Sequence, residues 1–281
     1  MNRLLVVAVL LFVLCSCKKD RPEEHVFVSG ISGDQGVYIG SEGNFQFGNA
    51  SLSYYDNGSN ENSPKVYENA NGFKIGDVLQ SIYQKGSTLY LVVNNSGKVE
   101  LVDQFTFKSK GSIAGFSSPR YFLTVSNSKA YVTDLYASAI AVVDLNTLEI
   151  IKSIQVTGWT EELIMVFGNV FVCNKGTDQV YVIDAATDVL VDSITVSAAP
   201  SSIVEDKNGM LWVLCKNGLH KIDPTTLSSL KSFVLNTSTE AFQLAINGTR
   251  DTLYFLNDGV FQFPISDSSI PTNPIIESES R

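Results

Sequence analysis

Side chains that usually carry catalysis or bind metals are scarce in this sequence. The chain of 281 residues has two histidines and four cysteines, and only His220, Cys173 and Cys215 fall in its repetitive part. No histidines, cysteines or carboxylates stand at the spacing of a metal site. The sequence also lacks a G-x-S-x-G nucleophile motif and a glycine-rich phosphate loop before a helix. These observations predict a protein that is not an enzyme, with no catalytic residue, no metal and no cofactor.

Five aspartates recur at a regular interval and are the one set that suggests carboxylate chemistry. Each ends an apolar run, and four of them are followed by threonine three residues later. The aspartates are Asp56, Asp103, Asp144, Asp184 and Asp223, and the threonines are Thr106, Thr147, Thr187 and Thr226. An aspartate in such a segment accepts backbone N–H groups of its own turn. Because the spacing puts each in a separate repeat, we interpret them as turn residues rather than as a catalytic pair.

The elements that carry these turns form a long repeat. An apolar run with an aromatic near its start recurs at intervals of 40 to 42 residues. Its aromatic residues are Tyr90, Tyr131, Phe171, Trp212 and Tyr254. Runs of alternating, β-branched and aromatic residues predict strands, and four antiparallel strands per repeat is the pattern of a propeller blade. The predicted fold class is therefore all-β, a β-propeller of four-stranded blades with six units, the first beginning at Val37.

The N-terminus has the features of a bacterial lipoprotein signal peptide. A basic start is followed by an apolar run from Leu4 to Leu14, which is too short to span a bilayer. Cys17 is the predicted acylated residue, because the preceding Ser16 is small. Cys15 fits less well, since Leu14 is too large for the position before the cleavage site.

This interpretation divides the chain into three parts. Residues 1–17 are the predicted signal peptide, residues 18–35 a charged tether, and residues 36–281 the propeller. Acyl chains on Cys17 anchor the protein to outer-membrane lipid without a transmembrane helix. Lys18, rather than aspartate, after the acylated cysteine favours the outer membrane over the inner one. We expect the cell surface, with the periplasmic face as the alternative.

The composition and net charge limit the classes of partner that we expect. A hydrophobic fraction of 44% against 17% charged residues is that of a packed globule. The net charge of −9 and the isoelectric point near 4.7 exclude nucleic acid as an expected partner. Cys173 and Cys215 lie one repeat apart, and we expect buried thiols on neighbouring blades rather than a disulfide.

Several segments resemble a known family. The tetrapeptide at 130–133 (AYVT) and the run at 180–184 (VYVID) look like the YVTN-type repeat of YncE-like propellers. Segments 41–45, 76–81, 93–96, 118–121 and 131–136 resemble the YncE-like β-propeller lipoproteins of Bacteroidota across nearly the whole chain. That family includes BtuG-type proteins, which capture cobalamin at the cell surface and pass it to a TonB-dependent transporter. The resemblance implies surface binding of a ligand, and more specifically a corrinoid.

The same resemblance raises the question of how the ring closes. The family's propeller has seven blades, whereas six units are visible here. We favour a C-terminally truncated seventh blade, which would leave sheet faces unpaired. The alternative is a six-bladed ring closed by Val26-Phe27-Val28 from the N-terminus.

The predicted ligand site is the top face, formed by the loops that enter the innermost strands and those that leave the aromatic-led strands. These loops differ between blades, as a binding surface requires. The ligand-binding candidates are Asn44, Phe45, Phe73, Asp77, Gln80, Asn94, Asn95, Arg120, Tyr121, Asp134, Tyr136, Trp159, Glu161, Asn174 and Lys175. Aromatic rings supply contact area and amides supply orientation for a large amphipathic ligand. Trp159 and Tyr136 are the strongest candidates, and Arg120 has a structural alternative, pairing with Asp77 or Asp134.

Three functions remain open from the sequence. The first is a surface lipoprotein that captures a ligand, with a corrinoid as the specific hypothesis and a TonB-dependent transporter as partner. The second is a propeller that scaffolds an envelope complex, which predicts a flatter and more apolar face. The third is a propeller lyase or quinoprotein enzyme, disfavoured by the scarcity of histidine.

Overall fold

The computed structural model describes residues 36–235 and 239–277. Within this part the chain is built from strands, with one short helix, α2 (Val66–Asn71), after the first sheet. No helix in these ranges is long and apolar enough to cross a membrane. The predicted signal peptide with Cys17 and the predicted tether lie outside the described residues.

The strands form six antiparallel sheets, each made of consecutive strands. The first contains β1 (Gly36–Ser41), β2 (Ser51–Asp56) and β3 (Glu61–Ser63). The second contains β4 (Leu79–Lys85), β5 (Thr88–Val93), β6 (Lys98–Asp103) and β7 (Ser109–Ala114). The third contains β8 (Pro119–Thr124), β9 (Lys129–Asp134), β10 (Ala139–Asp144) and β11 (Glu149–Gln155).

The remaining three sheets repeat this order. The fourth contains β12 (Thr160–Val166), β13 (Asn169–Asn174), β14 (Gln179–Asp184) and β15 (Val189–Thr195). The fifth contains β16 (Ser202–Glu205), β17 (Leu211–Cys215), β18 (Gly218–Asp223) and β19 (Ser228–Val234). The sixth contains β20 (Phe242–Ile246), β21 (Thr252–Leu256), β22 (Gly259–Pro264) and β23 (Ile276–Glu277).

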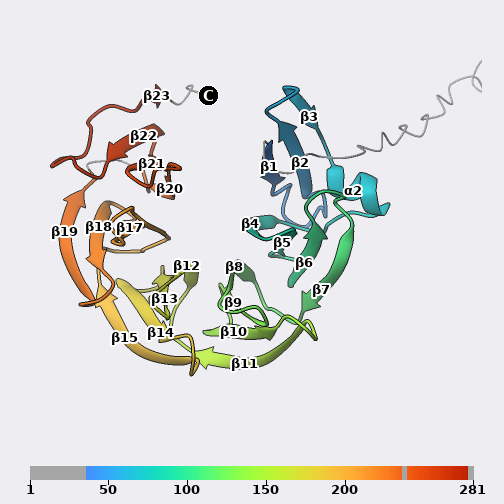
Figure 1. Cartoon of the computed structure of the whole chain (residues 1–281), viewed down its shortest axis with the longest axis horizontal. Coiled ribbons are helices and arrows are strands. Elements are labelled where there is room, and N and C mark those ends of the chain that lie inside the picture. The colour runs from blue at the N-terminus through green and yellow to red at the C-terminus, as the bar shows by residue number, and fades with distance from the viewer. Residues whose placement is uncertain (1–35, 236–238, 278–281) are drawn as a thin grey trace, which may run out of the picture.

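The sheets are arranged around a common centre as propeller blades (Figure 1). The first strands β4, β8, β12, β16 and β20 contact one another in succession at the inner side. The fourth strands β7, β11, β15 and β19 follow the outer rim (Figure 1). This arrangement confirms the predicted all-β propeller with six units.

Burial along the strands explains why the repeat is so regular. The second strands of the second to fifth blades are buried on both faces, as the runs around Tyr131, Phe171 and Trp212 show. The cores lie between neighbouring blades rather than within them. One cluster, for example, joins Phe171 and Cys173 of the fourth blade to Val213 and Cys215 of the fifth. The two thiols are buried there, as expected.

The first blade has three strands, whereas each of the other five described blades has four. β2 ends at Asp56, whose carboxylate accepts the N–H groups of Gly58 and Ser59, as Asp184 does for its own turn at the end of β14. β1 and β2 therefore occupy the second and third positions of a blade, and no strand among the described residues lies inside β1. Consequently Val37 and Ile39 of β1 are 50% and 43% exposed, unlike the buried second strands elsewhere.

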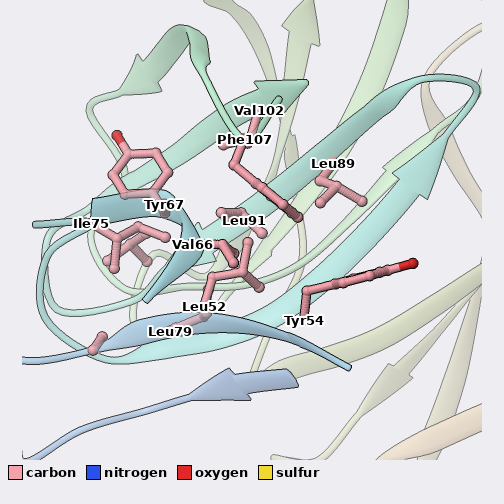
Figure 2. Close-up of a cluster of buried hydrophobic side chains, with 12 residues drawn as sticks. Leu52, Tyr54, Val66, Tyr67, Ile75, Leu79, Leu89, Leu91, Val102 and Phe107 are labelled. Carbon is pink, nitrogen blue, oxygen red and sulfur yellow. The ribbon is translucent and has the colours of Figure 1, made fainter. Parts of the chain in front are cut away.

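The first two blades are nevertheless packed by a large shared core. Leu52 and Tyr54 of β2, with Val66 and Tyr67 of α2, meet side chains of the second blade (Figure 2). Phe107 completes the cluster, with its ring centroid 6.0 Å from that of Tyr54. α2 thus covers the outer part of this core.

The six blades form an arc that is open between the first and the sixth blade (Figure 1). The sequence expectations about closure concern a seventh blade and Val26-Phe27-Val28, and that segment lies outside the described residues. The structure describes the arc without either closing element.

Candidate functional site

The loops of the predicted top face are fastened to one another by buried polar side chains. Asp134 is 3% exposed, and its carboxylate accepts backbone N–H groups from Ser117, Ser118, Tyr136 and Ala137. Those four bonds use the acceptor capacity that a ligand would need. Asp134 therefore holds two loops of the third blade in place.

Two of the predicted amides, Asn94 and Asn174, also link loops of this face. The side-chain amide of Asn94 donates to the Ser118 hydroxyl and the Pro119 carbonyl, both at 2.9 Å. The fully buried Asn174 donates to the Thr157 carbonyl. These bonds link the end of the second strand of a blade to the segment that leads into a first strand. The two amides thereby stabilise the loops of the face.

Asp77 makes a third set of hydrogen bonds between loops of this face. One carboxylate oxygen accepts the Gln46 backbone N–H at 2.7 Å and the side-chain amide of Asn95. The other oxygen, Oδ1, is buried without a hydrogen-bond partner. Asp77 thus ties the β1–β2 loop to the second blade.

Arg120 connects three neighbouring blades at the inner end of the top face. Its guanidinium donates from Nε and Nη2 to the two oxygens of Glu161, at 3.2 and 2.9 Å, and from Nη1 to Oε1 of Gln80. Gln80 lies in β4, Arg120 in β8 and Glu161 in β12, each at the irregular start of a first strand. The sequence offered Asp77 or Asp134 as the structural partner of Arg120, and the structure gives Glu161 instead.

Trp159 lies between two cations beside this group. The Arg120 guanidinium carbon is 5.6 Å from the centre of the indole ring, and the Lys175 ammonium is 4.8 Å from it. Lys175 also pairs with Glu240 at 2.7 Å. Cations over an indole face are attracted by the ring quadrupole. The indole nitrogen of Trp159 is buried and has no hydrogen bond of ordinary geometry, with Glu161 the nearby carboxylate.

The electrostatics of this group follow from burial. Loss of water raises the pKa of Glu161, and Arg120 opposes the rise. Burial also raises the pKa of the Tyr121 hydroxyl far above neutrality, with Glu162 and Glu161 adding to the effect. Tyr121 therefore stays protonated.

Below the Arg120 group a cavity of about 850 Å³ occupies the centre of the arc. Its wall is made mainly by first strands, together with β1, β21 and β22. Among its lining residues are Gln80, Tyr121, Glu162, Ser202 and Gln243. Two of these, Gln80 and Tyr121, are among the site residues predicted from the sequence.

The remaining candidates lie apart from this cavity. Asn44 and Phe45 are exposed in the β1–β2 loop, and Phe73 is exposed beside α2 with its ring against Tyr67. Tyr136 is 73% exposed on the loop after β9. The structure thus separates the predicted set into an inner group on three blades and an outer group of exposed aromatics.

Sequence reasoning missed Glu162, Ser202, Gln243 and Glu240. Glu162, Ser202 and Gln243 could have been found from the sequence, because each lies near the start of a first strand and these starts face the centre. The bulged positions in β8, β12 and β20 place two consecutive side chains there instead of one. Reading both residues at each bulge finds Glu162 next to Glu161.

Comparison with known proteins agrees with this geometry. The model of a domain of unknown function, DUF5074, matches residues 35–280. The chain belongs to the DUF5074 family. No curated protein sequence matches it.

Solved structures similar to this DUF5074 chain are propellers of diverse origin. A quinoprotein alcohol dehydrogenase-like protein from Bacteroides thetaiotaomicron has a TM-score of 0.68 at 16% identity, covering 88% of this chain and 65% of its own. A chain of the mitotic checkpoint complex has a TM-score of 0.69 at 12% identity, covering 87% and 74%. Hydrazine synthase from Kuenenia stuttgartiensis has a TM-score of 0.57 at 19% identity, covering 66% and 65%.

These likenesses establish the fold alone. The chain spans less than two thirds of the length of the alcohol dehydrogenase-like protein and of the hydrazine synthase chain. An enzyme and a WD40 propeller both occur among the similar structures, so the fold is compatible with catalysis and with binding.

Proposed function

We propose that this chain is a non-enzymatic binding protein that captures a ligand at the inner end of its top face. The observation that carries the proposal is the half-buried indole of Trp159, which has Arg120 and Lys175 over its ring. Arg120 in turn binds Gln80, a residue that lines a cavity of about 850 Å³. A cavity of this size with a few convergent polar groups suits a small organic ligand.

The chemistry of the surrounding side chains supports binding over turnover. Arg120 and Glu161 neutralise one another through two hydrogen bonds, so neither is free to exchange a proton with a substrate. Tyr121 is held in its protonated form. The amides of Gln80 and Gln243 provide donors and acceptors that orient a ligand without reacting with it.

The finer proposal is a corrinoid ligand, captured at the outer-membrane surface by a protein anchored through Cys17 and delivered to a TonB-dependent transporter. It is supported by the resemblance in sequence to BtuG-type lipoproteins. The flat aromatic Trp159 and the amide groups near it are of the type that would contact the ring and amide side chains of a corrinoid.

Calorimetric titration of cyanocobalamin into the purified full-length protein in detergent tests this proposal. We expect binding that weakens at least about tenfold in Trp159→Ala, because the ring supplies contact area and orders the two cations over it. Tyr136→Ala, a change of similar size on the exposed outer group, measures whether that group contributes. Absence of heat across micromolar to millimolar ligand rejects the corrinoid, and equal affinity in Trp159→Ala rejects the inner site.

A protein partner is a second candidate, favoured by the outer group of aromatics. Phe45, Phe47, Phe73 and Tyr136 are 54–73% exposed on the top loops. Exposed aromatics on one face are typical of protein interfaces. A photo-crosslinking residue in place of Phe47 in producing cells should capture one envelope protein, and the same residue at Ile151 of the outer strand β11 should not.

A further inference from the structure

The cavity at the centre of the arc contains a carboxylate without a counter-ion. Glu162 is half-buried in its wall, and Oε2 accepts the backbone N–H of Ile203 at 3.0 Å. Among the described residues Glu162 takes part in no salt bridge, although its neighbour Glu161 does. A charge in surroundings with little water calls for an opposite charge nearby.

The two cations beside Trp159 are already paired with other carboxylates. Arg120 binds both oxygens of Glu161, and Lys175 pairs with Glu240. Each of these pairs is neutral as a unit, so Glu162 gives the cavity a net negative charge. The chain's overall charge of −9 also favours the approach of cations over anions.

The rest of the lining suits an organic cation rather than a metal ion. Three tyrosines, Tyr38, Tyr121 and Tyr254, are among the residues of the wall. In the described ranges no group of three or more histidines, cysteines or carboxylates is placed to hold a metal. Aromatic faces together with one carboxylate are the surroundings in which substituted ammonium groups are bound.

We propose that the central cavity binds the ammonium or alkylammonium group of an organic ligand, with Glu162 as its counter-ion and aromatic side chains around it. This deepens the general proposal of ligand capture and rests on it only in that the ligand enters through the top face. It is separate from the corrinoid proposal, because cyanocobalamin carries no ammonium group. It assigns Glu162 a role in addition to the hydrogen bond that it accepts from the backbone N–H of Ile203 on the neighbouring blade.

The site also has a pH dependence that follows from its neighbours. Burial, with a smaller contribution from the charge of Glu161, raises the pKa of Glu162 to about 7 against the opposing hydrogen bonds from Ile203 and Ser202. Because the cation binds the ionised carboxylate, affinity is full above this value and falls about tenfold per pH unit below it.

Other ionisable groups lie near Glu162. Burial raises the pKa values of Tyr121 and of the Cys173 thiol, and both stay protonated. Burial raises the pKa of Glu161 and Arg120 lowers it, so the salt bridge favours its ionised form.

Choline and its neutral isostere 3,3-dimethylbutan-1-ol are the probes for a calorimetric test on the full-length protein. They share a shape and differ in the charge, which choline keeps at every pH. We expect choline to bind and the isostere to bind at least about tenfold more weakly. Glu162→Gln keeps the size and the acceptor for Ile203, and should weaken choline about tenfold or more. Glu149→Gln, an exposed position on β11, removes the same charge and should change nothing.

A second measurement needs no variant. The affinity of the unaltered protein for choline should fall as the pH is lowered from about 8 to 6. Equal binding of the two probes, unchanged choline affinity in Glu162→Gln, or the absence of choline binding at tens of millimolar overturns the inference. Cyanocobalamin binding that is sensitive to Trp159→Ala would in that case leave the proposed function standing, so the two failures are distinguishable.

Discussion

Removing Arg120 should destabilise the protein strongly, because its partner would be left as an uncompensated buried charge. Glu161 is 3% exposed and Arg120 donates to both of its oxygens. Breaking a buried pair of this kind costs about 3–5 kcal/mol. The Arg120 side chain is 17% exposed, which lets some water reach the vacated space, so we expect about 3 kcal/mol for Arg120→Ala.

Urea unfolding followed by circular dichroism measures this loss, and a thermal scan should show a fall in Tm of about 6–12 °C for a domain of this size. The matched control is Arg250→Ala. Arg250 pairs with Glu205 across two blades in the same way, but it is 45% exposed, and such pairs contribute about 1 kcal/mol or less. If the two alanine variants lose equal stability, burial of Glu161 is not what makes Arg120 important.

A pH series separates charge from packing. Without Arg120 the pKa of Glu161 rises further, since burial remains and the opposing cation is gone. An acid whose folded-state pKa is raised destabilises the fold above that pKa and is relieved as it takes up a proton. The deficit of Arg120→Ala should therefore shrink as the pH is lowered, and a constant deficit would indicate lost contacts instead of a lost charge.

Three further outcomes are expected. Trp212→Phe removes the 2.9 Å hydrogen bond from the indole to the fully buried Asp206, and should cost about 1–3 kcal/mol in urea unfolding. Asp184→Ala removes the acceptor for two backbone N–H groups and the Thr187 hydroxyl at an exposed turn, and should lower the urea midpoint by less than Trp212→Phe does. Glu162 has a folded-state pKa raised to about 7, so its contribution to stability is present below its unfolded pKa and is lost as pH rises toward 7; Glu162→Gln should flatten the measured dependence of stability on pH between about 4.5 and 7.

The blades could be predicted from the sequence because each one repeats the same physical requirements. A second strand buried on both faces needs apolar residues throughout, which gives the runs around Tyr131 and Phe171. The turn after each third strand needs a side-chain acceptor, which gives the aspartates. These constraints act within one blade and therefore appear in a short stretch of sequence.

The Arg120 group could not be predicted in the same way, since its members come from three blades. Gln80 and Glu161 lie 40 and 41 residues from Arg120. Composition suggested Asp77 or Asp134 as partners, but both are occupied by backbone N–H groups of nearby loops. What brings the group together is the register of neighbouring blades, one repeat apart, combined with bulges that alternation alone does not reveal.

The two tryptophans of the chain occupy contrasting surroundings. Trp212 is 1% exposed and packs against Phe263, with its ring centroid 5.8 Å away, whereas Trp159 is half-buried between two cations at the cavity mouth. The fluorescence of the two indoles should accordingly differ in its emission wavelength and in its quenching by iodide. With Trp212 replaced by phenylalanine, the protein would carry a single fluorescent reporter at the place where a ligand is expected to enter.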